Sequence, residues 1–182
     1  MTANEPATAQ GTTVWLTGLP SAGKTTIAHA LAERLRAAGA RVEVLDGDAV
    51  REHLTADLGY SRADRDTNVR RIGFVAHLLS RNGVLAICSL ISPYRAAREE
   101  IRALHDGRYF EVFVDTPSEV CAERDVKGLY AKQRRGEISG LTGVDDPYEP
   151  PEHPDVVVPT TRTSVAESAD LVLDALRRAG RL

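Results

Sequence analysis

The stretch TVWLTGLPSAGKTT, residues 13–26, constrains this chain more than any other part of its sequence. An apolar run leads into a loop from Gly18 to Thr25 that fits the pattern G-x-x-x-x-G-K-[ST]. In such a loop, backbone N–H groups surround phosphate oxygens, the lysine reaches the outer phosphates and the hydroxyl binds Mg²⁺. Because the pattern follows a predicted strand and opens a predicted helix, it predicts a phosphate-binding P-loop in which Lys24 and Thr25 contact the ligand.

The rest of the chain alternates apolar runs with amphipathic segments. Five strands are predicted at residues 13–17, 42–46, 84–91, 109–115 and 155–159. Apolar residues at helical spacing occupy residues 27–35, 69–79 and 165–176. This alternation predicts an α/β fold of the P-loop NTPase type, a doubly wound five-stranded parallel sheet with flanking helices. Ligands of such sheets bind beyond the carboxyl ends of the strands.

Helix ends are also visible in the sequence. Gly39 predicts the end of the first helix, and Asn82-Gly83 the end of the second. Ser164 is a predicted N-cap for the last helix, which should stop near Gly180.

The length of 182 residues fits one domain. Residues 1–12 are polar and small, which predicts a disordered tail before a single domain over residues 13–182. Residues 126–154 hold several glycines and prolines and no sustained apolar period, so we expect a mobile lid there.

Composition argues against several classes of protein. A net charge of −3 disfavours a broad nucleic-acid surface. We find neither a signal peptide nor an apolar run long enough to span a membrane, and therefore expect a cytoplasmic protein with reduced Cys88 and Cys121. The five histidines are scattered singly, which disfavours a histidine-based metal site.

Asp46 and Asp48, in LDGDAVR, follow the second predicted strand and should face the P-loop. One carboxylate could hold Mg²⁺ or its water shell, and the other could accept a proton from an attacking hydroxyl. A turn with a helix cap is the alternative interpretation, which the neighbouring P-loop makes the weaker one.

The segment GYSRADRDTNVRR, residues 59–71, places several arginines around a helix start. A solvated charged face would explain them. However, Arg65 and Asn68 share a helical face and Tyr60 offers an aromatic plane, a combination that suits an anionic ligand containing a base.

Ser92, in LISPYRAAR, follows the third predicted strand. It is either a turn or helix-cap residue or a catalytic or substrate contact.

GTPases share the P-loop pattern. The sequence DVKG at residues 125–128 imitates their D-x-x-G, but no N-K-x-D base-reading motif follows and the position does not come straight after a strand. A small-molecule kinase fits better.

Taken together, these segments make the sequence similar to the adenylylsulfate kinases (APS kinases) from about residue 13 to residue 158. The similarity rests on motifs that occur in the family's order: GLPSAGKTT, LDGDAVR, LGYSRADRDTNVRRIG, ISPYR, VFVDTPSEVCAERDVKGLYAKQRRGEI and LTGVDDPYEPPEHP.

Enzymes of this family transfer the γ-phosphoryl group of MgATP to the 3′-hydroxyl of adenylyl sulfate, which gives PAPS, the activated sulfate donor. The resemblance therefore implies a P-loop kinase with a mobile lid, ATP and Mg²⁺ as cofactors and adenylyl sulfate as acceptor. It also implies a role in sulfate assimilation, a homodimer as in many family members, and a functional link to an ATP sulfurylase.

The resemblance also implies site residues. Those for ATP are Gly18, Leu19, Pro20, Ser21, Ala22, Gly23, Lys24, Thr25, Thr26 and Arg124. Those for adenylyl sulfate are Asp48, Ala49, Val50, Arg51, Tyr60, Arg65, Asp66, Thr67, Asn68, Ile91, Ser92, Lys127, Gly128, Leu129, Gly140 and Leu141. Thr25 and Asp46 are the candidates for metal binding, and the catalytic candidates are Lys24, Asp46, Asp48 and Ser92. Ser92 matches a serine reported as phosphoserine in bacterial members.

Three places depart from the family pattern. Pro20-Ser21 replaces the usual Ser-Gly, where we expect little effect, and Ala49 replaces a common Asn. The family clamps the acceptor's adenine between two Phe rings, whereas this chain has Tyr60 and Leu141. Leucine keeps an apolar contact but loses a stacking contribution of about 1 kcal/mol. We therefore expect weaker acceptor binding or an altered acceptor.

Two mechanisms and two other functions remain open. Transfer is either direct, with Asp48 or Asp46 as base, or passes through a phosphorylated Ser92. The alternatives to an APS kinase are a P-loop kinase for another hydroxylated acceptor and a non-catalytic nucleotide-sensing module.

Overall fold

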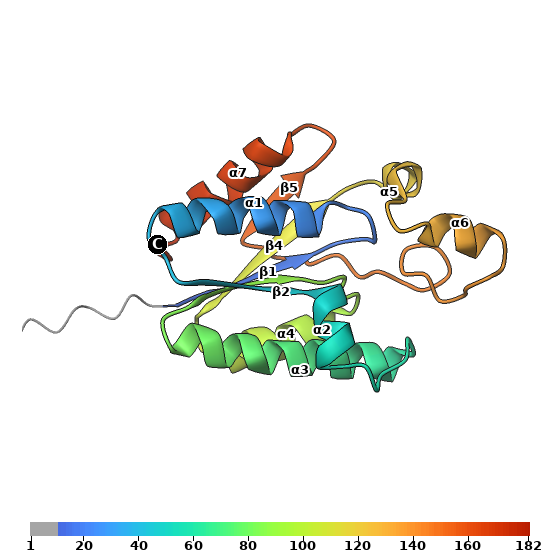
Figure 1. The fold of residues 1–182 in the computed structure, drawn as a ribbon, viewed down its shortest axis with the longest axis horizontal. Coiled ribbons are helices and arrows are strands. Elements are labelled where there is room, and N and C mark those ends of the chain that lie inside the picture. The colour runs from blue at the N-terminus through green and yellow to red at the C-terminus, as the bar shows by residue number, and fades with distance from the viewer. Residues whose placement is uncertain (1–10) are drawn as a thin grey trace, which may run out of the picture.

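A computed structural model describes residues 11–182. Within them, a central sheet carries helices on both faces (Figure 1). In chain order, its elements are β1 (Thr13–Thr17), α1 (Lys24–Ala37), β2 (Val42–Asp46), α2 (Gly47–His53), α3 (Arg62–Arg81), β3 (Leu85–Ser89), α4 (Arg95–Leu104), β4 (Tyr109–Asp115), α5 (Ser118–Arg124), α6 (Leu129–Arg134), β5 (Val156–Pro159) and α7 (Val165–Arg178).

The strands lie in the order β2-β3-β1-β4-β5, and every neighbouring pair is parallel. The predicted doubly wound parallel sheet is therefore confirmed. Strand β3 is shorter than predicted because the chain leaves the sheet after Ser89, and Ser92 then adopts a left-handed backbone with φ of 41°.

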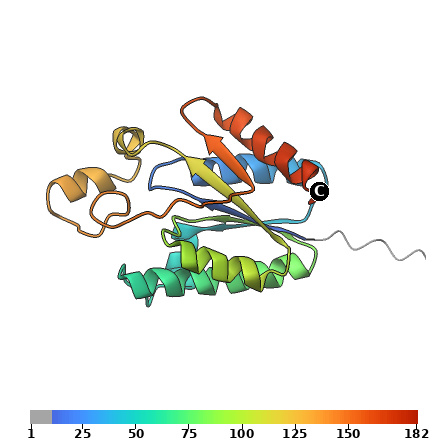
Figure 2. The same ribbon diagram turned by 180° about the vertical axis from the view of Figure 1, so that it is seen from behind.

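Two apolar clusters cover the two faces of the sheet. Val14 and Leu16 of β1 pack in one cluster with residues of α1 and α7, whereas Trp15 between them packs in the other with residues of α3 and α4. Figure 2, seen from behind, shows α4 beside α3 on the second face. Because successive strand residues point to opposite faces, strands buried on both sides are apolar at most positions, as β1 and β3 are here.

The predicted helix ends are confirmed. Positive φ values at Gly39, Gly83 and Gly180 follow α1, α3 and α7. Ser164 caps α7 in a capping box, where the Ser164 Oγ accepts from the Glu167 N–H and the Glu167 carboxylate accepts from the Ser164 N–H. Helix α3 begins earlier than its apolar period suggests, because the Ser61 hydroxyl caps it and its first turns are charged.

The tail prediction was wrong at its inner end, while residues 1–10 lie outside the described part. Gly11 and Thr12 are buried. A Cβ on Gly11 would lie 2.3 Å from the Ser80 carbonyl oxygen, so only glycine permits this approach to the end of α3.

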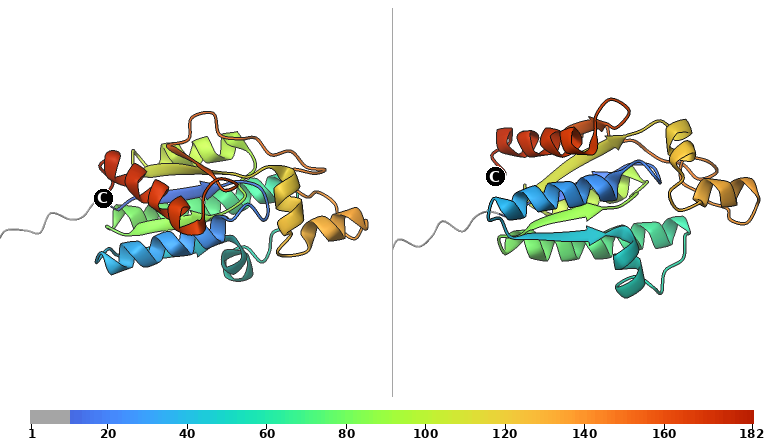
Figure 3. Two further views of the ribbon diagram at one scale, coloured as in Figure 1. Left: turned by 90° about the horizontal axis from the view of Figure 1, so that it is seen from above. Right: turned by 45° about the horizontal axis from the view of Figure 1, so that its top comes forward.

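Beyond the carboxyl ends of the strands, α5, α6 and the following loop project from the sheet (Figure 3). The predicted lid thus contains one short helix, α6. No helix among residues 11–182 has the length and apolar character needed to cross a membrane.

Candidate active site

The P-loop joins β1 to α1 at the centre of the sheet. A Cβ on Gly18 would lie 2.6 Å from the Val114 carbonyl oxygen, so the loop can leave β1 beside β4 only through glycine. The buried Lys24 side chain donates from Nζ to the carbonyl oxygens of Gly18 (2.9 Å) and Leu19 (2.7 Å). Burial lowers the pKa of Lys24 from 10.5 to about 8.

Thr25, in the first turn of α1, lies against the end of β2. Its hydroxyl donates to Asp46 Oδ2 at 2.8 Å and lies 3.1 Å from the Ser89 hydroxyl. Asp46 Oδ1 accepts from the Asp48 N–H at 3.0 Å, so Asp46 also caps α2. The helix-cap interpretation of this aspartate is therefore confirmed, and Asp46 also lies beside the P-loop, where a role in metal binding or proton transfer stays a prediction.

Asp48 faces the base of the lid. Its carboxylate forms an ion pair with Lys127, and both side chains remain more than half exposed. The pair joins α2 to the segment between α5 and α6 across the mouth of the site.

Arg51 and Tyr60 lie together on the α2 side. The Arg51 guanidinium carbon is 4.5 Å from the centroid of the Tyr60 ring, a cation–π distance. The Tyr60 ring is 66% exposed, which leaves much of it open to a ligand.

Arg65 joins the start of α3 to the lid. Its Nε donates to the Tyr60 carbonyl (2.9 Å), and its Nη2 donates to the Gly140 carbonyl (2.5 Å). One guanidinium group therefore sets the separation between the segments that carry Tyr60 and Leu141. On the same face of α3, as predicted, Asn68 accepts through Oδ1 from Thr55 at 2.7 Å.

Ser92 does not cap a helix, because α4 begins three residues later with Tyr94 at the N-cap. Its buried hydroxyl accepts from Trp15 Nε1 at 3.0 Å and donates to Thr17 Oγ1 at 3.0 Å.

Arg124, at the end of α5, lies over the P-loop. Its Nη1 donates to the Ala22 carbonyl (3.2 Å) and to Thr160 Oγ1 (3.2 Å). It therefore joins the loop to the turn that follows β5.

A cavity of about 1100 Å³ brings most of the predicted residues together. Those that line it are Pro20, Ser21, Ala22, Gly23, Lys24, Thr25, Thr26, Asp46, Asp48, Arg51, Tyr60, Arg65, Asn68, Ile91, Ser92, Arg124, Lys127, Leu129, Gly140 and Leu141. Those outside its lining are Gly18, Leu19, Ala49, Val50, Asp66, Thr67 and Gly128. Val50, for example, packs in the core, while the Thr67 hydroxyl donates to the Ala63 carbonyl within α3.

One wall of this cavity is absent from the predicted site. Thr160, Thr163 and Ser164 line it from the loop between β5 and α7, and Val165 lines it from the start of α7. A signal existed, because that loop follows the carboxyl end of a predicted strand, where ligands of parallel sheets bind.

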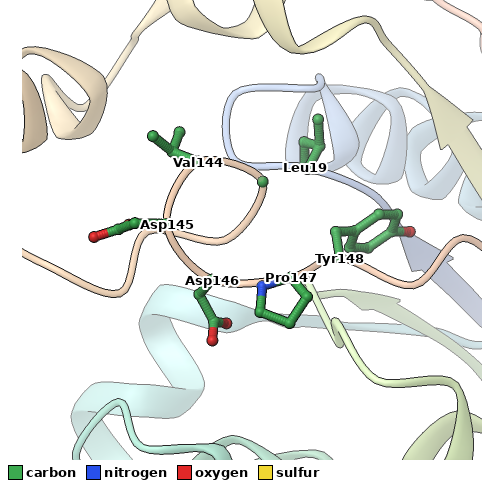
Figure 4. A pocket seen from close by; sticks show the side chains of 7 residues that line it. Leu19, Val144, Asp145, Asp146, Pro147 and Tyr148 are labelled. Atoms are coloured by element: carbon green, nitrogen blue, oxygen red, sulfur yellow. The ribbon is translucent and has the colours of Figure 1, made fainter.

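A second hollow of about 520 Å³ lies between Leu19 of the P-loop and residues 143–148. The Tyr148 ring stacks on Phe113 with centroids 6.3 Å apart, and its hydroxyl is 3.0 Å from Thr17 Oγ1. Asp145 and Asp146 point away from Leu19 (Figure 4). The hollow thus lies where residues 143–148 of the predicted lid face the P-loop.

Comparison with known proteins gives concordant results. A family model described as "Adenylylsulphate kinase" matches residues 10–159. An adenylyl-sulfate kinase of Synechococcus sp. (strain JA-3-3Ab) is 59% identical over 173 residues, which is 95% of this chain and 98% of the relative.

Solved structures of APS kinases have a fold similar to that of this chain. The Mycobacterium tuberculosis APS kinase in complex with AMPPNP and APS superposes with a TM-score of 0.89 at 44% identity, covering 92% of this chain and 98% of that one. A hexameric APS kinase from Thiobacillus denitrificans superposes with a TM-score of 0.75 at 39% identity, covering 98% of this chain and 31% of that one. The P-loop, the paired aspartates and the arginine-rich start of α3 thus converge on one cavity in a chain that belongs to the adenylylsulfate kinase family.

Proposed function

We propose that this chain transfers the γ-phosphoryl group of ATP to the 3′-hydroxyl of adenylyl sulfate, which gives 3′-phosphoadenylyl sulfate and ADP. One observation carries the proposal: a P-loop and a group of arginine, aromatic and carboxylate side chains line the same cavity. A phosphoryl donor and an anionic acceptor containing a base can therefore meet there.

The donor half comprises the P-loop, Lys24 and Arg124. Lys24 is buried beneath the loop, and its ammonium group can stabilise the negative charge that develops on the transferred phosphoryl group. Arg124 donates to the Ala22 carbonyl and to Thr160 of the β5–α7 wall, at the side where we place the adenine of ATP.

The site also suits Mg²⁺. A hydroxyl and a carboxylate oxygen lie together at Thr25 and Asp46. No group of three or more histidine, cysteine or acidic side chains among residues 11–182 could hold a metal, which agrees with an ion that keeps waters and phosphate oxygens as its other ligands. When bound, Mg²⁺ neutralises charge on the phosphates.

Asp48 is the better candidate for the base. Both oxygens of Asp46 are engaged, by the Thr25 hydroxyl and the Asp48 N–H. Asp48 faces the cavity mouth, where Lys127 orients its carboxylate. In this mechanism, Asp48 accepts the proton of the 3′-hydroxyl as that oxygen attacks phosphorus and the bond to the ADP leaving group breaks.

Direct transfer is favoured over a phosphorylated Ser92. The Ser92 hydroxyl is buried and already makes hydrogen bonds to Trp15 and Thr17. To attack a phosphate, it would have to leave both partners. We therefore expect Ser92→Ala to retain near-normal turnover, whereas complete loss with intact ATP binding would favour the phosphoenzyme.

The decisive experiment is a coupled ADP-release assay with adenylyl sulfate and, separately, other hydroxylated acceptors. We expect ADP release with adenylyl sulfate and near-complete loss in Lys24→Ala. Release with a different acceptor alone would identify another P-loop kinase, and nucleotide binding without release to any acceptor would identify a sensing module.

The pKa of Lys24 supplies a second test. Phosphate binding favours the charged lysine, so ADP affinity should fall by up to about tenfold per pH unit above pH 8.

The free energy of unfolding should change in the opposite direction and rise with pH. The unfolded lysine stays protonated up to its pKa of 10.5, so the cost of burying the ammonium is present below pH 8 and is relieved between pH 8 and 10.5. Calorimetry and urea unfolding at pH 7 to 10 measure both trends, and Lys24→Met should lack them.

We further propose that the enzyme acts in the cytoplasm as a homo-oligomer, supplied with adenylyl sulfate by an ATP sulfurylase. One solved relative is described as hexameric. Light scattering on purified protein measures the mass, and a monomeric mass would contradict the oligomer.

A further inference from the structure

Tyr130 of α6 contacts the P-loop from the side of the apolar core. Its hydroxyl donates to the Pro20 carbonyl oxygen at 3.1 Å, although the two residues are 110 positions apart in the chain. The ring is 4% exposed and packs in the apolar cluster that contains Ala22 and Cys121. Burial raises the pKa of Tyr130 above its ordinary value, so the hydroxyl keeps its proton and can donate at neutral pH.

This contact orients one peptide unit of the loop. In a planar trans peptide, the C=O and the N–H of the next residue point in opposite directions. A Pro20 carbonyl directed toward Tyr130 therefore directs the Ser21 N–H away from it. Ser21 lines the large cavity, whereas Tyr130 packs on the core side of the loop. Since proline has no N–H, Ser21 supplies the first amide donor after Leu19.

The oriented peptide needs support. Ser21 has a φ of 62°, a left-handed conformation that costs free energy for residues with a Cβ and persists only where the surroundings hold it. The same position is the one at which this chain departs from the family's usual glycine.

The start of α6, which carries Tyr130, is held to the end of α5. The Asp125 carboxylate accepts from the Tyr130 N–H (3.0 Å) and the Ala131 N–H (2.9 Å) at the start of α6. Just before it, Arg124 donates to the Ala22 carbonyl. Helices α5 and α6 thus donate hydrogen bonds to two carbonyl groups of the loop, those of Ala22 and Pro20.

We propose that Tyr130 is a positioning residue for the P-loop, whose hydroxyl turns the Pro20–Ser21 peptide so that the Ser21 N–H faces the nucleotide phosphates. The inference rests on the proposed function only where the loop is assigned to a nucleotide. It is tested without any acceptor, so failure of the acceptor assay and failure of this inference are separate results.

The first test is Tyr130→Phe, with ADP affinity measured by calorimetry. Loss of one hydrogen bond that positions a phosphate donor should raise the Kd about threefold to tenfold. The matched control is Tyr109→Phe, because Tyr109 is also buried but its hydroxyl has no hydrogen-bond partner among the described residues. It lies at the opposite end of the sheet, and its Kd should equal that of the wild type. Equal ADP affinities in all three folded proteins would overturn the proposal.

The second test uses the wild-type protein and does not depend on how the variant folds. With serine labelled by ¹⁵N, the Ser21 amide resonance should shift on ADP addition by more than that of Ser80, which is buried near the opposite end of the sheet. A Ser21 amide that does not respond to ADP would contradict the proposal.

Discussion

The two halves of the segment between α5 and β5 are attached to the domain in different ways. Residues 126–139, here called the flap, contact the body of the domain through the Lys127–Asp48 ion pair and the Tyr130–Pro20 hydrogen bond. Residues 140–154, here called the strap, are held by many more bonds.

Glu149 shows how the strap is fixed. Its carboxylate accepts from the Arg95 N–H (2.8 Å), its carbonyl accepts from Arg98 Nη2 (2.6 Å), and its N–H donates to the Pro93 carbonyl (2.9 Å). Elsewhere in the strap, Arg65 holds the Gly140 carbonyl and the Tyr94 hydroxyl donates to Asp146 at 3.1 Å. Regions with few buried contacts open most readily, so we expect lid movement in the flap rather than across residues 126–154.

The largest expected effect comes from Arg98→Met. Arg98 is 1% exposed, pairs with the buried Glu111 at 3.1 Å and donates to the Ser92 and Glu149 carbonyls. Removing it leaves a buried carboxylate with Arg102 as its partner and leaves two carbonyls unpaired. We expect a loss of about 3–5 kcal/mol in the free energy of unfolding, measured in urea.

The control is Arg70→Met, which removes an exposed pair with Glu100 and should change the free energy of unfolding by at most about 1 kcal/mol. A loss in Arg98→Met no larger than in this control would show that the strap is not held through Arg98.

Hydrogen exchange compares the halves directly. Strap amides such as those of Gly143 and Glu149, which donate to backbone carbonyls, should exchange at least about tenfold more slowly than the amides of α6. That ratio corresponds to about 1.4 kcal/mol in opening free energy. Equal exchange in the two halves would remove the distinction between flap and strap.

Leu141 lies where the flap meets the strap. It is 7% exposed, packs in the core cluster and also lines the cavity. Leu141→Phe should restore a stacking contribution of about 1 kcal/mol and lower the KM for adenylyl sulfate about fivefold. Leu141→Met keeps the volume without the ring and should leave the KM unchanged. An equal gain in both variants would exclude stacking as the cause.

The smallest stability effect is expected for Lys127→Ala in the flap. The Lys127 and Asp48 side chains are 54% and 71% exposed, so the free energy of unfolding should change by less than about 1 kcal/mol, while the KM for adenylyl sulfate rises. Urea unfolding and steady-state kinetics measure the two. A stability loss comparable to that of Arg98→Met would mean that the flap is attached as firmly as the strap.

Several features could be predicted because they depend on neighbours in sequence. Buried strands appear as apolar runs, helices as a 3.6-residue period, and helix ends as Gly39, Gly83 and Ser164. The meeting of the P-loop with Asp46 and Asp48 followed from one topological rule, that parallel strands present their carboxyl ends at one edge.

Other features could not be predicted, because their partners are remote. In the sequence, Arg98 resembles any surface arginine of an amphipathic helix, and only the tertiary structure places Glu111 of β4 next to it. Ser92 resembled a helix cap, and only the packing of β3 against β1 places its hydroxyl between Trp15 and Thr17.

By itself, the sequence determined the strand–loop–helix unit at residues 13–26, the α/β alternation and the family, since these rest on local pattern and motif order. Only the tertiary structure shows that Arg98 binds the Glu149 carbonyl of the strap and that Tyr130 donates to the Pro20 carbonyl. The physical reason is that hydrogen bonds and buried ion pairs between distant residues leave no periodic signal, and they exist only once the sheet has brought their partners together.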